Sequence, residues 1–261
     1  MFEHQLHVAL DAVREQGASH LKVEFEAEGA SSVDAEALAA IANDADLWLA
    51  VKVGGCEAVR DIRESLHLRA RSIVAPMIES PFAATKFERA VTDEVNASGL
   101  QLPHLAINIE SVAGMSALPQ ILQAPAMKRI DRMVLGRTDL TDSLNLGPVE
   151  VDGATVEAIA RRAFGLAQEA GLATTLGGTV TSNSVRFITA LTGLIDSVET
   201  RKVVLSMEDV SNLPRAIEAG VRFELAWLEF KSQVLGPLTP IETRRLRLIT
   251  ARLNPGSSAC E

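Results

Sequence analysis

The chain has 261 residues, of which 47% are hydrophobic, and this composition excludes a disordered chain and is typical of one large domain or two small ones. With 25 Lys and Arg against 34 Asp and Glu, the formal net charge is −9, which argues against nucleic acid as a partner. Two cysteines, Cys56 and Cys260, make neither a disulfide framework nor a zinc-ligand spacing, and no uncharged apolar run reaches the ~18 residues of a membrane span. We therefore expect a cytoplasmic protein with no membrane partner.

Short apolar runs alternate with helical patterns along the chain. Seven runs predict strands, at residues 21–27, 47–53, 72–77, 105–110, 132–136, 173–177 and 197–205. Between them lie amphipathic stretches that begin at signals such as Ser80 with Pro81 and end at Gly171, Gly193 or Gly220. This repeated strand–helix pattern favours an α/β fold of the TIM-type (β/α)8 barrel over a doubly wound sheet.

The end of the chain follows a different pattern. Residues 221–227 alternate as a strand would but also repeat at helical spacing, and we predict a helix there, which leaves the eighth strand unassigned. Pro237 and Pro240 interrupt the chain before a basic helix at 241–253. We divide the chain into a barrel domain, 1–235, and an extension, 236–261, with a detached helix. Such a helix packs either on a neighbouring subunit or on its own barrel, and we expect a contact with a second subunit in a homo-oligomer.

Polar residues occupy strand positions that a barrel places on its axis. In the first strand, apolar Val23 and Phe25 belong under the helices, which turns Lys22, Glu24 and Glu26 inward. The same alternation turns Lys52, Asn108 and Glu110 inward. In the last strand Glu199 and Arg201 share one parity, with Lys202 on the other. Interior charges cost several kcal/mol each unless they are paired or bind a metal. Internal salt bridges are one explanation, but the charges gather near the carboxyl ends of the strands, which indicates an active site.

Four segments together resemble the HpcH/HpaI aldolase and citrate lyase family: KVGGCEAVRD (52–61), IVAPMIESP (73–81), INIESVAGMSALPQIL (107–122) and MVLGRTDLTDSLNLG (133–147). The resemblance covers roughly residues 20–205. It implies that Glu110 and Asp139 ligate a divalent cation, and two carboxylates with open positions suit Mg²⁺ or Mn²⁺. It also implies a trimer or a hexamer.

The resemblance implies a metal-dependent carbon–carbon lyase of the aldolase type. Such an enzyme forms or cleaves a bond between an aldehyde and pyruvate, or a related 2-oxo acid, through a metal-stabilised enolate. The alternatives are a citrate lyase-like enzyme acting on a citryl, malyl or other acyl-CoA, and a barrel that has lost catalysis. Lys52 also admits a Schiff-base mechanism without metal.

The chain departs from the pyruvate aldolases of the family at two positions: Lys52 replaces an Arg, and Ala27 replaces a His. The base must then be a metal-bound water or a carboxylate with a raised pKa, for which Glu24 and Glu26 are the candidates. Lys52 is expected to hold the substrate oxyanion or carboxylate. Five residues are assigned to substrate binding: Arg137, which replaces the usual Pro, Gly136, Asn108, Glu79 and Arg201. For Arg137 a surface position on a mobile loop is the alternative, and for Glu79 a position before the Ser80 cap.

Overall fold

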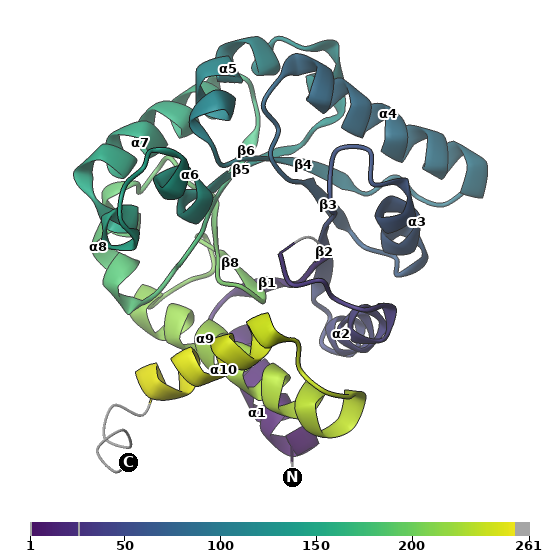
Figure 1. Ribbon diagram of the computed structural model, residues 1–261, viewed down its shortest axis with the longest axis vertical. Helices are drawn as coiled ribbons and strands as arrows, with labels where there is room; N and C mark the ends of the chain where they lie inside the picture. The colour runs from purple at the N-terminus through teal and green to yellow at the C-terminus, as the bar shows by residue number, and fades with distance from the viewer. Residues whose placement is uncertain (1, 26, 254–261) are drawn as a thin grey trace.

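The computed structural model describes residues 2–25 and 27–253, and within them eight strands form a closed barrel with helices around it (Figure 1). The strands are β1 (Ala18–Glu24), β2 (Trp48–Lys52), β3 (Ser72–Ala75), β4 (His104–Ile109), β5 (Arg132–Gly136), β6 (Ala173–Gly177), β7 (Ser197–Glu199) and β8 (Val203–Ser206). The α-helices are α1 (Phe2–Glu15), α2 (Ser32–Asp44), α3 (Val59–His67), α4 (Pro81–Ser98), α5 (Val112–Leu122), α6 (Arg137–Ser143), α7 (Ala154–Glu169), α8 (Val185–Ala190), α9 (Leu213–Phe230) and α10 (Pro240–Leu253). The predicted α/β barrel is confirmed.

The eighth strand closes the barrel as an antiparallel strand, which the sequence did not predict. β1 to β7 pair in parallel, whereas β8 runs antiparallel to both β7 and β1. The single strand predicted at 197–205 is a hairpin, because the chain turns at 200–202, where the Thr200 N–H donates to the Val203 carbonyl at 2.9 Å. Residues 221–227 lie in α9, as predicted.

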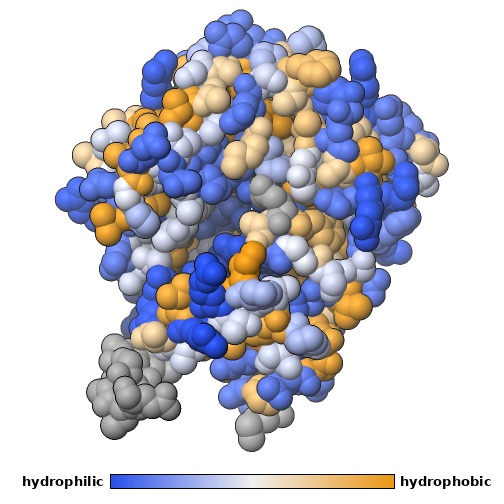
Figure 2. Space-filling view, in the orientation of Figure 1, coloured by the Kyte–Doolittle hydropathy of each residue, from blue (hydrophilic) through white to orange (hydrophobic). Residues whose placement is uncertain are grey.

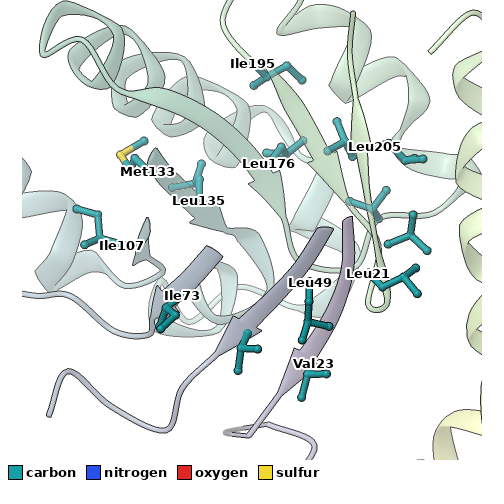
Figure 3. Packing of buried hydrophobic residues seen from close by; sticks show 14 of the residues in the cluster. Leu21, Val23, Leu49, Ile73, Ile107, Met133, Leu135, Leu176, Ile195 and Leu205 are labelled. Atoms are coloured by element: carbon teal, nitrogen blue, oxygen red, sulfur yellow. The ribbon is translucent and has the colours of Figure 1, made fainter. Parts of the chain in front are cut away.

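The strands separate an apolar layer from a polar axis. Residues such as Leu21, Val23, Leu49, Ile73 and Ile107 are buried in the main core between strands and helices (Figure 3). Because side chains alternate along a strand, residues of the opposite parity face the axis. On β1, for example, the alternation leaves Lys22 and Glu24 on the axis, so the packing of the helices is what directs these charges inward.

The C-terminal helix packs on its own barrel, so the prediction that it is detached is wrong. α10 lies along α9 (Figure 1), and Ile249 is fully buried in the core. Arg245 pairs with the buried Glu224 of α9 at 2.5 Å, and Lys231 binds Glu242 at 2.6 Å. An apolar residue and two ion pairs therefore hold α10 in place. The division at 235/236 and a contact with a second subunit stay predictions.

Candidate active site

A cavity of about 190 Å³ opens at the carboxyl ends of the parallel strands. Figure 2 shows this face hollowed near its middle, with hydrophilic residues in the hollow. The polar and charged side chains that line it come from several strands, from the turns after them and from α10: Lys22, Glu24, Lys52, Asn108, Glu110, Thr138, Asp139, Thr179, Glu199, Thr200, Arg201 and Arg245. The cavity lies at the carboxyl end of the barrel, where the inward-facing charged residues predicted an active site.

Glu110, directly after β4, is the most enclosed acid of the cavity, with 2% of its side chain exposed. Its carboxylate accepts hydrogen bonds from Lys52 Nζ at 3.2 and 3.3 Å, from the Met77 N–H at 3.0 Å and from Asn108 Nδ2 at 2.5 Å. Burial raises the pKa of Glu110 above its usual range; the Lys52 charge opposes this rise, and the Asp139 charge adds to it. The buried Glu110 and the exposed Asp139 therefore line one cavity, and their charges repel each other.

Gly136, at the end of β5, makes room for this carboxylate. A Cβ at position 136 would lie 2.6 Å from Glu110 Oε2, closer than real atoms approach, and 3.2 Å from Asn108 Oδ1, which is a tight contact. Asn108 Oδ1 is itself buried and has no hydrogen-bond partner among the residues that the structure describes. An acceptor left in this state calls for a donor or a cation beside it.

The donor set fits a hard divalent cation. Glu110, Asp139 and the unpartnered Asn108 Oδ1 supply oxygen atoms, which Mg²⁺ and Mn²⁺ prefer, and a cation would offset the repulsion between the two carboxylates. Within residues 2–25 and 27–253, no three His, Cys, Asp or Glu side chains are grouped to hold a metal. A cation here would therefore use two carboxylates, the amide oxygen and ligands from water or substrate.

A second charge network surrounds Glu24 at the wall of the cavity. Lys22 Nζ lies 2.8 Å from Glu24 and 2.6 Å from Glu199, and Arg201 lies 3.9 Å from Glu24 and 2.9 Å from Glu28. Burial alone would raise the pKa of Glu24, but the charges of Lys22 and Arg201 outweigh it and lower the pKa to about 2. Glu24 therefore does not have the raised pKa expected of it as a base, because its cationic neighbours favour the carboxylate. Glu26, the other candidate, lies outside the described residues.

Arg137 does not face the cavity, so its expected substrate contact is corrected. Its side chain is fully buried and stacks 4.6 Å from the Phe187 ring centroid. The guanidinium donates to the Gly177 carbonyl at 3.2 Å, to the Gly178 carbonyl at 2.8 Å and to the Asp152 carboxylate. These acceptors occupy the donors of the planar guanidinium. Arg137 therefore connects α6 to the loop after β6 and is neither a substrate ligand nor a mobile surface residue.

Glu79 is also outside the cavity. It is exposed after β3 and accepts a hydrogen bond from the Ser111 hydroxyl, which caps α5 by accepting from the Gly114 N–H at 3.1 Å. The expected substrate contact of Glu79 therefore finds no support in the geometry, and its observed role is to orient a helix cap.

Three charged lining residues, Lys22, Glu199 and Arg245, were not assigned to the site from sequence. Lys22 binds Glu24 and also lines the cavity. Glu199 shares the parity of Arg201, and this alternation could have identified Glu199 as a lining residue. Arg245 offered no such signal, because its position depends on how α10 folds back over α9.

The fold and this cavity define a barrel protein with a charged site at the carboxyl ends of its strands. The family model described as HpcH/HpaI aldolase/citrate lyase matches residues 33–189, more than half of the chain, and the chain belongs to that family. The family is one of lyases, which supports a lyase here. No curated protein matches the chain.

Several solved structures share the fold. An HpcH/HpaI aldolase/citrate lyase family protein from Burkholderia cenocepacia J2315 has a TM-score of 0.57 and 20% identity, over 73% of this chain and 80% of that one. Citrate synthase SbnG has a TM-score of 0.56 and 18% identity, over 71% and 78%. The HpcH/HpaI aldolase from Desulfitobacterium hafniense DCB-2 has a TM-score of 0.55 and 17% identity, over 69% and 78%. Separately, none of the described helices has the length and apolar character to cross a membrane.

Proposed function

We propose that the protein is a divalent-metal-dependent carbon–carbon lyase of the aldolase type, which forms or cleaves a bond to pyruvate or a related 2-oxo acid. The observation that carries this proposal is the set of oxygen atoms at the cavity from the buried Glu110 and Asn108 Oδ1 and from Asp139, which is exposed at the cavity wall. A Mg²⁺ or Mn²⁺ ion held by these residues supplies the positive charge that stabilises an enolate.

The residues around these oxygen atoms bind and orient the substrate. Lys52 lies beside Glu110 with its ammonium at the cavity wall, where it can hold a substrate carboxylate or a developing oxyanion. Asn108 keeps the Glu110 carboxylate in place through Nδ2. Arg201, with 31% of its side chain exposed, adds a cation at the mouth for the substrate's anionic end.

Schiff-base chemistry at Lys52 receives less support. An amine attacks a ketone only in its neutral form, and the Glu110 carboxylate 3.2 Å away stabilises the ammonium. The two carboxylates beside it would also have no task in such a mechanism. Glu24 is charged and ion-paired, so we assign it the task of holding Lys22 and Arg201 in position.

The second candidate is a citrate lyase-like enzyme acting on a citryl, malyl or other acyl-CoA. One observation favours it: Arg201 and Arg245 both line the cavity and are 31% and 27% exposed, so two cations meet an anionic substrate at the mouth. Such a pair suits a polycarboxylate or the phosphates of a CoA. A barrel without catalysis is the outcome if both substrate classes fail.

The test is proton NMR of pyruvate in deuterated buffer, which follows exchange of the methyl protons. We expect exchange with Mg²⁺ or Mn²⁺ and none with chelator, and we expect its loss in Glu110→Gln and Asp139→Asn. Asp142→Asn is the matched control, because Asp142 lies on the same short helix, is exposed and does not line the cavity. Exchange that survives chelation, or that Asp142→Asn abolishes equally, contradicts the proposal. No exchange with any metal excludes the pyruvate reaction and directs the assay to acyl-CoA cleavage.

A further inference from the structure

A second and larger cavity, of about 520 Å³, opens at the other end of the barrel. Its lining includes residues from the first halves of β1, β2, β3 and β5, among them His20, Ala50, Ser72 and Arg132, and Ser206 at the end of the antiparallel β8. Glu199 lines both this cavity and the active-site cavity, so it belongs to the wall between them. The volume is in the range of small-molecule sites.

Arg132 is the cation of this second cavity. Its Nη1 donates to Thr175 Oγ1 and to Ser197 Oγ, both at 2.8 Å, so two neutral hydroxyls orient the guanidinium. Among the described residues, no carboxylate lies within 4 Å of it in an ion pair, although burial lowers its pKa. A largely buried guanidinium in this state is suited to receive an anion.

The acids nearest to Arg132 are already engaged. Asp196 accepts from the Thr174 N–H at 2.6 Å, Asp131 accepts from the Leu105 N–H at 2.8 Å, and Glu199 binds Lys22 at 2.6 Å. They lower the positive potential at Arg132 without occupying its donors. A singly charged ligand is therefore accommodated here more easily than a dianion.

An apolar wall adjoins the cation. Val134 is the next inward residue after Arg132 on β5, and with Val74 and Ala106 it forms a hydrophobic cluster separate from the main core. Val74, Val134 and Ala50 all line the cavity. The cavity thus combines the Arg132 cation and a wall of small apolar side chains with three lining carboxylates, those of Asp196, Glu199 and Glu208.

We propose that this cavity is a second binding site, for a short-chain aliphatic monocarboxylate. The carboxylate accepts from Arg132 and from nearby hydroxyls, and the hydrocarbon tail packs against Val74, Val134 and Ala50. A planar carboxylate matches the guanidinium fork. The site is independent of the proposed lyase reaction, because the two cavities lie at opposite ends of the barrel and the cluster of Glu110 and Asp139 lines only the other one.

Trp48 offers a readout that does not depend on activity. Its ring stacks on His104 with centroids 5.5 Å apart and meets the edge of His20 at 5.2 Å, and His20 lines the cavity. The chain has two tryptophans, so a Trp227→Phe background leaves Trp48 as the sole indole. The fluorescence of Trp48 is measured during titration with 3-methylbutanoate, acetate, inorganic phosphate or chloride at constant ionic strength. Calorimetry on the unaltered chain checks the affinity.

We expect saturable binding of 3-methylbutanoate, at least tenfold weaker binding of acetate, and none of phosphate or chloride. Arg132→Gln removes the cation and Ala50→Leu fills space in the cavity, so each should weaken the binding at least tenfold. Circular dichroism verifies that both variants fold. Arg201→Gln, at the other mouth, should leave it unchanged. Absence of saturable binding, equal binding by Arg132→Gln, loss in Arg201→Gln, or phosphate binding as tight as the carboxylate's overturns the proposal.

Discussion

Lys52 of β2 and Glu110 after β4 meet across the carboxyl end of the barrel, with Nζ 3.2 Å from Oε2 and side-chain exposures of 8% and 2%. The strand between them, β3, contributes the Met77 N–H from the loop that follows it, and this donor binds the same carboxylate. Three successive strands of the barrel therefore hold one buried anion. The arrangement makes Glu110 the residue on which the charge balance of the cavity depends.

Replacing Lys52 by Met leaves Glu110 buried without its cation. Breaking a buried ion pair in this way costs about 3 to 5 kcal/mol, and we expect a lower midpoint of thermal unfolding in chelator. If a divalent cation binds Glu110 and Asp139, Mn²⁺ should raise the midpoint of Lys52→Met more than that of the unaltered protein. Lys86→Met is the control, because the Lys86–Glu57 pair is partly exposed. An equal effect of Mn²⁺ on all three proteins would speak against the metal site.

Gly136→Ala tests the room beside Glu110. The added Cβ would lie 2.6 Å from Glu110 Oε2, so the carboxylate must leave its present position. We expect a loss of at least tenfold in pyruvate methyl exchange, with destabilisation of about 1 to 3 kcal/mol measured by denaturant unfolding. Gly165→Ala on α7, where an added Cβ meets no atom within 4 Å, should leave exchange unchanged. Full activity in Gly136→Ala would show that the position of Glu110 is not critical.

His20 predicts a pH dependence of stability. Burial, followed by the charges of Arg132 and His104, lowers its pKa from 6.5 to about 4. Between these values the unfolded chain holds the proton and the folded protein does not, so stability falls as the pH falls from 6.5 through 4. The shift corresponds to about 2 kcal/mol at pH 5. Urea unfolding at pH 7 and pH 5 should show a smaller loss for His20→Gln than for the exposed control His7→Gln. Identical losses would remove His20 as the cause.

The residues that face the barrel axis could be predicted from the sequence, whereas the antiparallel strand that closes the barrel could not. Alternation placed Lys52, Asn108 and Glu110 correctly, because apolar residues of one parity must pack under the helices whatever the detailed geometry. It did not reveal the hairpin of β7 and β8, since a turn inside one apolar run leaves the alternation on each side intact. Whether a strand pairs in parallel or antiparallel depends on its neighbours in the sheet, which the alternation within one strand does not show.

Long-range contacts explain the other errors. Arg137 follows a strand end, where substrate ligands occur, but Asp152 and the Gly177 and Gly178 carbonyls bind it, and these lie 15 to 41 residues further along the chain. The raised pKa expected of Glu24 is not found, because Lys22 and Arg201 face it and their combined effect on its pKa depends on distances. The cytoplasmic location and the trimer or hexamer stay predictions.

Arg245 gives the last test, because it joins the C-terminal helix to the cavity. Its guanidinium forms two bonds to the buried Glu224, at 2.5 and 2.7 Å, and lines the mouth. Arg245→Gln alone would leave Glu224 without its cation, so the informative variant is Arg245→Gln with Glu224→Gln, which keeps hydrogen-bonding groups and removes both charges.

We expect the double variant to unfold at nearly the midpoint of the unaltered protein but to show a KM about tenfold higher for the cleaved anionic substrate. One lost charge-assisted contact of about 1.4 kcal/mol corresponds to this factor, and kcat should change little because Arg245 lies at the mouth, away from the Glu110 cluster. Arg244→Gln, an exposed neighbour on α10, is the control and should retain the original KM. If KM stays constant in the double variant, Arg245 only anchors α10 through Glu224, and substrate recognition at the mouth falls to Arg201.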